Sequence, residues 1–240
     1  EQKKIENNTS EIIEVAYDLQ SGSYIDFVKS NPKQSKLYSD ELSYILNNHL
    51  DQNDSLLDIG TGELTTLSLI TSKLDPLPSK IYAFDISWSR LFKGIEFSKE
   101  ILGNNFNKIF PFSAKISEIP LMSNSIDITT SSHALEPNGG NLSNLLKELF
   151  RVTKKKLVLF EPYYEGNSKE GKKRMDSLGY IKNLEEEVIN LGGELIENIK
   201  IRNSENLLNP TYCFVIKPPL SKEPKLLPDG NIFSEPGTNN

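Results

Sequence analysis

The chain has 240 residues, of which 37% are hydrophobic and 25% are charged, and its formal net charge is −6 at pH 7. This length suits one α/β domain with a modest extension. No apolar run approaches the ~20 residues of a membrane span and no signal-like stretch opens the chain, so we expect a cytoplasmic protein without a membrane partner, monomeric or homodimeric. The acidic balance disfavours nucleic acid as a partner, because such binding relies on clustered Lys and Arg.

The single cysteine, Cys213, lies in the apolar run Tyr212-Cys213-Phe214-Val215-Ile216. One cysteine excludes an intramolecular disulfide and a paired-cysteine zinc site, and we expect no metal centre. Cys213 is therefore predicted to be a small core residue.

The first 50 residues are predicted to form an N-terminal helical cap. After a polar start, the segment from Glu11 to about Phe27 is predicted to be a short helix followed by a turn that contains Gly22. A clearer amphipathic helix begins near Ser35 or Ser39, with apolar residues at intervals of three and four up to Leu50.

Apolar runs of strand length then alternate with helical stretches. Strands are predicted at 55–59, 80–85, 108–112, 125–131 and 156–160, and helices at 64–74, 89–102 and 142–152. Such alternation indicates a doubly wound, Rossmann-like sheet that is mostly parallel.

The end of the chain changes character. After a helix over about 184–191, two extended runs at 194–202 and 211–217 predict a hairpin, which makes the last of seven strands antiparallel. We assign residues 51–217 to the main domain, and 218–240 to a Pro-rich extended tail.

A glycine-rich turn follows the first predicted strand. Asp58 ends that strand, and Gly60 and Gly62 form the turn into a helix. Backbone without Cβ atoms permits such a turn and lets a ligand approach closely, while the free N–H groups of the helix start suit a carboxylate. Asp85 closes the next strand, where an acid can accept the hydroxyl protons of a ribose. Together these residues predict an adenosine-containing cofactor.

Three features distinguish S-adenosylmethionine from a dinucleotide. Dinucleotide sites need a third glycine three residues after the second, and Thr65 stands there. The antiparallel last strand is foreign to dehydrogenase sheets, and Asp58 suits a cationic methionyl group. We therefore expect S-adenosylmethionine.

The same residues resemble the class I S-adenosylmethionine-dependent methyltransferases. Asp58-Ile59-Gly60-Thr61-Gly62 resembles their motif I, Ala83-Phe84-Asp85-Ile86 their motif II, and residues 119–127 a stretch of the methyltransferase type 11 group. The resemblance covers about residues 55–165 and implies cofactor contacts by Asp58, Gly60, Gly62, Asp85, Ile86, Ser113, Ala114 and Ser131. Leu64 at the usual third glycine of motif I, and Ser113 in place of an adenine-binding Asp, depart from the pattern.

An aromatic segment precedes the core. In similar methyltransferases a segment in this position often covers the cofactor, which implies a lid made by Tyr17, Gln20 and Tyr24. Plain packing of a capping helix is the alternative.

The loop after the fourth strand, residues 131–140, combines His, Glu and Asn with glycines. Loops at the carboxyl ends of parallel strands border the ligand, so we predict His133 as a general base oriented by Glu136. Tyr163, after the fifth strand, is a further catalytic candidate. The basic run Lys172-Lys173-Arg174 is expected on the same side of the sheet. It could hold an anionic acceptor, or it could form the solvated face of a helix.

These features predict methyl transfer to a small-molecule acceptor. A sugar, a nucleotide-linked compound or a surface-polysaccharide precursor, methylated on oxygen or nitrogen, is the favoured class. The alternatives are a tRNA or rRNA methyltransferase and a catalytically silent cofactor-binding partner protein.

Overall fold

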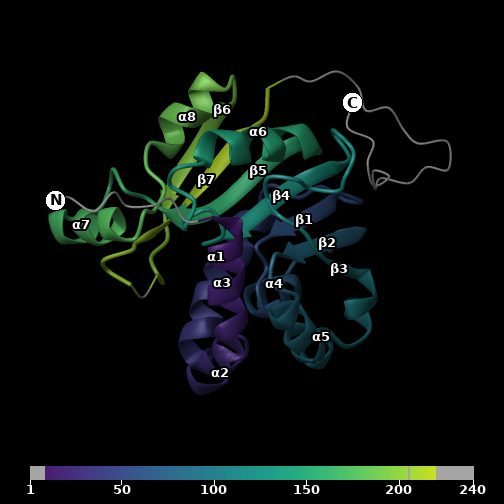
Figure 1. Ribbon diagram of the computed structural model, residues 1–240. Helices are drawn as coiled ribbons and strands as arrows, with labels where there is room; N and C mark the ends of the chain where they lie inside the picture. Colours follow the sequence, from purple (N-terminus) through teal and green to yellow (C-terminus); the bar gives the residue numbers. More distant parts are fainter. Residues whose placement is uncertain (1–8, 205, 220–240) are drawn as a thin grey trace.

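A seven-stranded sheet forms the centre of the molecule (Figure 1). The computed structural model describes residues 9–204 and 206–219. The strand order is β3-β2-β1-β4-β5-β7-β6. In chain order the strands are β1 (Ser55–Ile59), β2 (Lys80–Asp85), β3 (Ile109–Ser113), β4 (Ile126–Ser132), β5 (Thr153–Pro162), β6 (Glu194–Lys200) and β7 (Thr211–Lys217). Every strand predicted from the sequence is confirmed, with bounds that differ by a few residues.

The direction of β7 sets this sheet apart from a fully parallel one. Strands β1 to β5 pair in parallel, whereas β7 pairs antiparallel with both β5 and β6. The loop between β6 and β7 therefore lies at the carboxyl edge of the parallel strands. The predicted mostly parallel, Rossmann-like sheet with an antiparallel last strand is confirmed.

Helices cover both faces of the sheet, and each face has its own core. One core contains side chains of α3 (Pro32–Asn47), α4 (Thr65–Thr71) and α5 (Trp88–Leu102). The other contains side chains of α6 (Leu142–Val152) and α8 (Leu184–Asn190). Because successive residues of a strand point to opposite faces, Leu56 lies in the first core and Leu57 in the second. Cys213 is fully buried in the first core, which confirms its predicted place.

The N-terminal cap is divided into more helices than predicted. Helix α1 (Ser10–Leu19) and helix α2 (Ser23–Ser30) are separated at Gly22, whose φ of +103° breaks the helix. Helix α3 begins at Pro32 rather than near Ser35, since proline is well suited to the first turn of a helix.

Two further elements were not predicted, the 3-10 turn η1 (Gly103–Lys108) and the helix α7 (Lys169–Ser177). Only Gly171 and Met175 of α7 are buried, so its sequence carries no apolar period.

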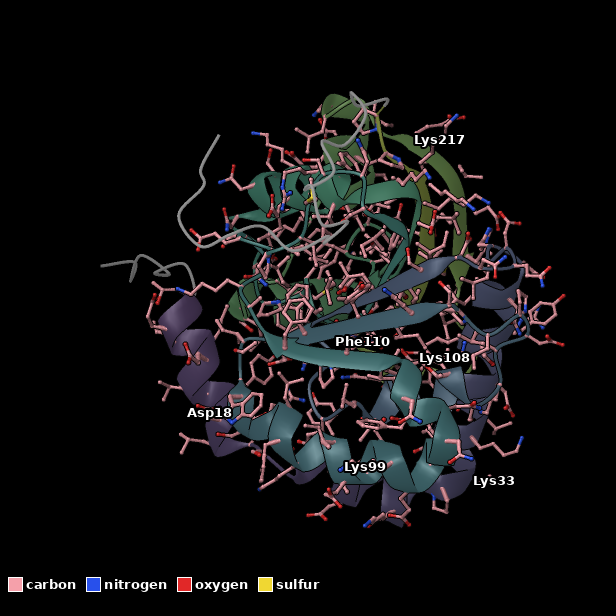
Figure 2. All side chains as sticks on the ribbon, turned by 90° about the vertical axis from the view of Figure 1, so that its right-hand side faces the viewer. Asp18, Lys33, Lys99, Lys108, Phe110 and Lys217 are labelled. Carbon is pink, nitrogen blue, oxygen red and sulfur yellow. The ribbon has the colours of Figure 1, made fainter. Side chains whose placement is uncertain are left out.

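Of the predicted tail, only residues 218 and 219 fall within the described part of the chain. No helix there is long and apolar enough to cross a bilayer. Figure 2 views the sheet from its β3 edge, where Phe110 is labelled.

Candidate active site

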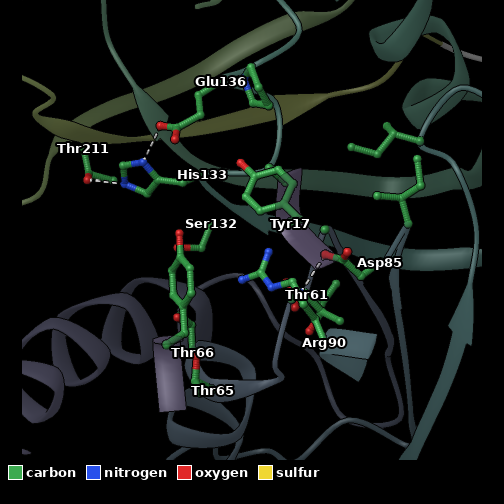
Figure 3. A pocket seen from close by; sticks show the side chains of 18 of the residues that line it. Tyr17, Thr61, Thr65, Thr66, Asp85, Arg90, Ser132, His133, Glu136 and Thr211 are labelled. Atoms are coloured by element: carbon green, nitrogen blue, oxygen red, sulfur yellow. Dashed lines mark hydrogen bonds and ion pairs between the residues drawn. The ribbon is translucent and has the colours of Figure 1, made fainter. Parts of the chain in front are cut away.

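A cavity of about 680 Å³ lies at the carboxyl edge of the sheet. Asp58, Asp85 and Ser132, from the ends of β1, β2 and β4, line it. Figure 3 labels Asp85 and Ser132. The N-terminal helices contribute Tyr17 and Tyr38 to the wall of the same cavity. The strand order thus brings together side chains that lie far apart in the sequence.

The turn between β1 and α4 forms the floor of one end of the cavity. Gly60 and Gly62 have φ values of +59° and +55°, a region that favours glycine. A Cβ at Gly60 would lie 2.5 Å from that of Ala134, and one at Gly62 would lie 2.5 Å from the guanidinium of Arg90. A side chain at Gly60 would clash with Ala134, and one at Gly62 would displace the Arg90 guanidinium. Both glycines line the cavity with their backbone.

Asp85 closes β2 beside this turn and is 5% exposed. One carboxylate oxygen accepts the N–H of Gly62 and the other accepts the N–H of Ser87, both at 2.8 Å. Burial raises the pKa of Asp85, while these N–H groups and the nearby charge of Arg90 act against that rise. Each oxygen keeps a further lone pair, so the carboxylate can still accept two hydroxyl groups.

Asp58 lies next to this turn, near the end of β1, and is 7% exposed. Burial raises its pKa to about 7, and the charges of Asp85 and Glu161 add to the effect. Within the described part of the chain Asp58 forms no ion pair. A buried carboxyl group without a cation is suited to a positively charged ligand.

Glu63 joins the N-terminal cap to the glycine turn, and the sequence did not predict this role. It is 1% exposed and accepts the N–H groups of Gly22 and Ile25, both at 2.9 Å, at the start of α2. Arg90 Nε lies 3.7 Å from the same carboxylate. Because the partners of Glu63 lie 41 and 38 residues earlier in the chain, no local pattern marks it.

Arg90 in turn holds two of the three predicted lid residues. Its guanidinium carbon lies 4.9 Å from the ring centroid of Tyr17 and 4.6 Å from that of Tyr24. Both rings line the cavity. Gln20 caps the end of α1, is exposed, and is not part of the cavity wall.

The opposite end of the cavity contains His133 and Glu136. His133 has a φ of +58°, and its Nδ1 lies 2.8 Å from a carboxylate oxygen of Glu136. Its Nε2 lies 2.7 Å from the hydroxyl of Thr211, the first residue of β7 (Figure 3). The His133 side chain is 30% exposed and lines the cavity. The imidazole is therefore fixed at both nitrogens but open to a ligand.

The His133–Glu136 pair is electrostatically coupled. Burial alone lowers the pKa of His133, but the hydrogen bond and charge of Glu136 outweigh it and leave that pKa above its ordinary value. Burial would raise the pKa of Glu136, and His133 reverses this effect. Each of the two side chains therefore favours the charged form of the other.

Glu161, near the end of β5, is fully buried and forms hydrogen bonds with the loop that carries His133. Its Oε1 accepts the N–H groups of Ala134 and Leu135 at 3.0 and 3.1 Å, and the hydroxyl of Ser131 at 2.7 Å. Ser131 therefore lies under the loop rather than in the cavity, where its neighbour Ser132 lies instead. Because neighbouring residues on a strand point to opposite faces of the sheet, the side chain of Ser132 faces the cavity and that of the predicted Ser131 does not.

Of the three residues that the resemblance places near the adenine, two lie in the cavity wall. Ile86 and Ala114 line the cavity, as the family resemblance implies. Ser113 does not line it, because its exposed hydroxyl donates to the carbonyl of Ile86 at 3.3 Å. Leu64 has a φ of +55°, and its fully buried side chain lies in the core behind the turn.

Tyr163 lies outside the cavity, unlike the other two catalytic candidates. Its ring packs against Tyr212 and Phe214, with centroids 4.9 and 5.5 Å apart. Its hydroxyl donates to Glu185 at 2.8 Å. Tyr163 therefore belongs to the packing beyond β5 rather than to the wall of the site.

Solved structures share this arrangement of strands and helices. A methyltransferase from Aquifex aeolicus described as SAM-dependent matches with a TM-score of 0.59 and 18% identity, over 80% of this chain and 97% of its own. Magnesium protoporphyrin IX methyltransferase from Synechocystis PCC 6803, solved with bound SAH, matches with a TM-score of 0.61 and 11% identity, over 85% and 98%. The protein has the class I methyltransferase fold.

A third structure with the class I methyltransferase fold comes from the complex of the Haloferax volcanii Trm112 methyltransferase activator with its partner. It matches with a TM-score of 0.65 and 14% identity, over 84% of this chain and 96% of that one. No protein-family model and no curated sequence matches the chain. At these identities the likeness establishes the fold, and the reaction has to be argued from the site.

Proposed function

We propose that the protein transfers a methyl group from S-adenosylmethionine to an oxygen or nitrogen atom of a small-molecule acceptor. One observation carries the proposal: a single cavity has the glycine turn with Asp58 and Asp85 at one end and the His133–Glu136 pair at the other. When bound, S-adenosylmethionine supplies an activated methyl group on a cationic sulfur atom.

The cofactor end fits this molecule. Asp85 has free lone pairs for the two ribose hydroxyls, and Asp58 is a buried carboxyl group that lacks a cation. Ile86 and Ala114 would pack on the adenine. Tyr17, held by Arg90, would cover the methionyl part and exclude water.

At the acceptor end, His133 would remove a proton from the attacking atom, and Glu136 would stabilise the resulting imidazolium ion. The acceptor group would take the place of the Thr211 hydroxyl at Nε2. Alignment of the reacting atoms can supply about 7–11 kcal/mol of the barrier. A base adds about 10²- to 10⁴-fold, so positioning is the larger contribution.

The cavity wall favours a hydroxylated small molecule. Its volume, about 680 Å³, falls in the usual range for small-molecule sites and suits a polymer poorly. Six residues with side-chain amides line the cavity, which suits a sugar or a nucleotide-linked or polysaccharide precursor: Gln34, Asn138, Asn141, Asn203, Asn206 and Asn209.

Calorimetric titration with S-adenosylhomocysteine, S-adenosylmethionine and NAD tests the cofactor. We expect the first two to bind and NAD not to bind; binding of NAD alone would overturn the proposal. A screen of hydroxylated metabolites for S-adenosylhomocysteine release then tests the reaction. Cofactor binding without release from any acceptor would instead support the silent partner protein.

A further inference from the structure

Arg174 on α7 reaches the acceptor end of the cavity. It lines the cavity wall, and its guanidinium carbon lies 5.7 Å from the ring centroid of Tyr180. Tyr180 lines the same wall and helps to lower the pKa of Glu136, so it links Arg174 to the His133–Glu136 pair. Arg174 Nη1 is buried and has no hydrogen-bond partner among the described residues.

The charge of Arg174 is not neutralised by the protein. Arg90 has Glu63 beside it and His133 has Glu136, but Arg174 forms no ion pair within residues 9–204 and 206–219. A buried donor that lacks a partner costs free energy, and a bound anion offsets that cost with charge-assisted hydrogen bonds.

Asn209, in the loop before β7, offers a complementary acceptor atom. It is 5% exposed and lines the cavity. Its Nδ2 donates to Glu136 at 2.9 Å, which fixes the orientation of the amide. Its Oδ1 is buried without a partner, so it can accept a hydroxyl or an N–H group from a ligand.

We propose that the acceptor is a hydroxylated small molecule with a carboxylate or phosphate group, which Arg174 binds while Asn209 accepts one of its hydroxyls. This inference rests on the proposed function, since it concerns the acceptor of that reaction. The anionic group fixes one end of the acceptor at Arg174, beside Tyr180, and leaves its other polar groups to face His133.

Titrations of the full chain, with and without saturating S-adenosylhomocysteine, test the proposal. The probes are D-glucuronate, glucose 1-phosphate and the neutral methyl glucoside. We expect an anionic probe to bind, and Arg174→Gln to weaken that binding about tenfold or more. Lys173→Gln is the matched control, because it removes the same charge from an exposed position one residue away. It should leave binding unchanged, and Arg174→Lys should restore part of it.

The outcomes separate this inference from the proposed function. Failure of both anions to bind, equal binding of the neutral glucoside, or an equal effect of the two glutamine variants would overturn the role of Arg174. Comparison of glucuronate with the phosphate shows which anion the site prefers. Anion binding that depends on Arg174, in a protein that does not bind S-adenosylhomocysteine, would support the anion site while the proposed function fails.

Discussion

The carboxylate of Asp85 accepts the backbone N–H of Gly62 at 2.8 Å, and this bond ties the end of β2 to the turn that follows β1. The second oxygen holds the N–H of Ser87 at the start of the next helix. Asp85 therefore shapes both turns of the cofactor end and also presents the lone pairs that a ribose would need.

Replacement of Asp85 should consequently affect both binding and stability. We expect Asp85→Ala to weaken S-adenosylhomocysteine binding by roughly 1.5–3 kcal/mol and to lower the free energy of unfolding by about 1–3 kcal/mol. Titration and denaturant unfolding measure the two effects. Asp127→Ala is the control, because Asp127 accepts the N–H and hydroxyl of Ser55 outside the cavity. A folded Asp85→Ala protein with unchanged affinity would remove Asp85 from the site.

Asp58 should couple cofactor binding to pH. Its folded pKa of about 7 lies above its unfolded value, so its contribution to stability is greatest at low pH and is lost as the pH rises through about 7. Asp58→Asn should then be more stable than the wild type at about pH 8, yet bind S-adenosylmethionine more weakly. Wild-type affinity should rise between about pH 6 and about pH 8, since ionised Asp58 attracts the cationic sulfur.

Glu161→Gln is the control for this experiment, because burial raises the pKa of Glu161 to about 7 as well, but Glu161 is not part of the cavity wall. It should keep the pH dependence of S-adenosylmethionine binding, with the midpoint moved to lower pH, because the charge of Glu161 adds to the rise in the pKa of Asp58. If Asp58→Asn kept that dependence too, another group would be responsible.

Glu63 should control the order of the N-terminal cap. Glu63→Gln removes one of two acceptors for the N–H groups at the start of α2, at a cost of about 1–3 kcal/mol. Hydrogen exchange should become faster in α1 and α2, and S-adenosylhomocysteine affinity should fall as Tyr17 and Tyr24 lose their support. Asp26→Asn, an exposed change on the same helix, should alter neither measurement. Unchanged exchange in Glu63→Gln would show that the order of the cap does not depend on Glu63.

His133→Ala should reduce turnover by about 10²-fold or more without loss of cofactor binding. Wild-type turnover should rise with pH through a midpoint above the ordinary histidine value, because Glu136 raises the pKa of His133. Glu136→Gln removes that charge and should move the midpoint to lower pH. The stability contributed by protonated His133 is lost as the pH rises through its folded pKa, so the deficit of His133→Ala should shrink at high pH. Normal turnover of His133→Ala would assign the histidine a structural role.

Much of the fold could be predicted because parallel strands are buried on both faces. Such strands appear as apolar runs, as in 157–160 and in 56–59, where only Asp58 is polar. The ends of these runs located Asp58 and Asp85, since the carboxyl ends of parallel strands share one edge. Strand ends are uncertain by a residue, however, and Ser132 lines the cavity where Ser131 was predicted. Ser113 was implied by the family resemblance together with Ala114, and only Ala114 lines the cavity.

The rest of the site depends on contacts between distant segments. Glu63 has a role only because α2 packs beside it, and Arg174 only because the polar helix α7 places it beside Tyr180. Asn209 acquires an oriented amide from Glu136, which lies 73 residues away in the sequence. No spacing rule in the chain marks such residues.

Strand β7 begins at the edge where β1 to β5 end, so a hairpin loop, and not a crossover helix, supplies Asn209 and Thr211 to the acceptor end. A hairpin loop can change in length and sequence with little effect on the strands that it joins. Evolution can therefore exchange one acceptor for another by altering residues 201–210, while the glycine turn and Asp85, on the far side of the sheet's centre, continue to serve the same cofactor. This strand order therefore separates the segment that would contact the acceptor from the segments that would hold the cofactor.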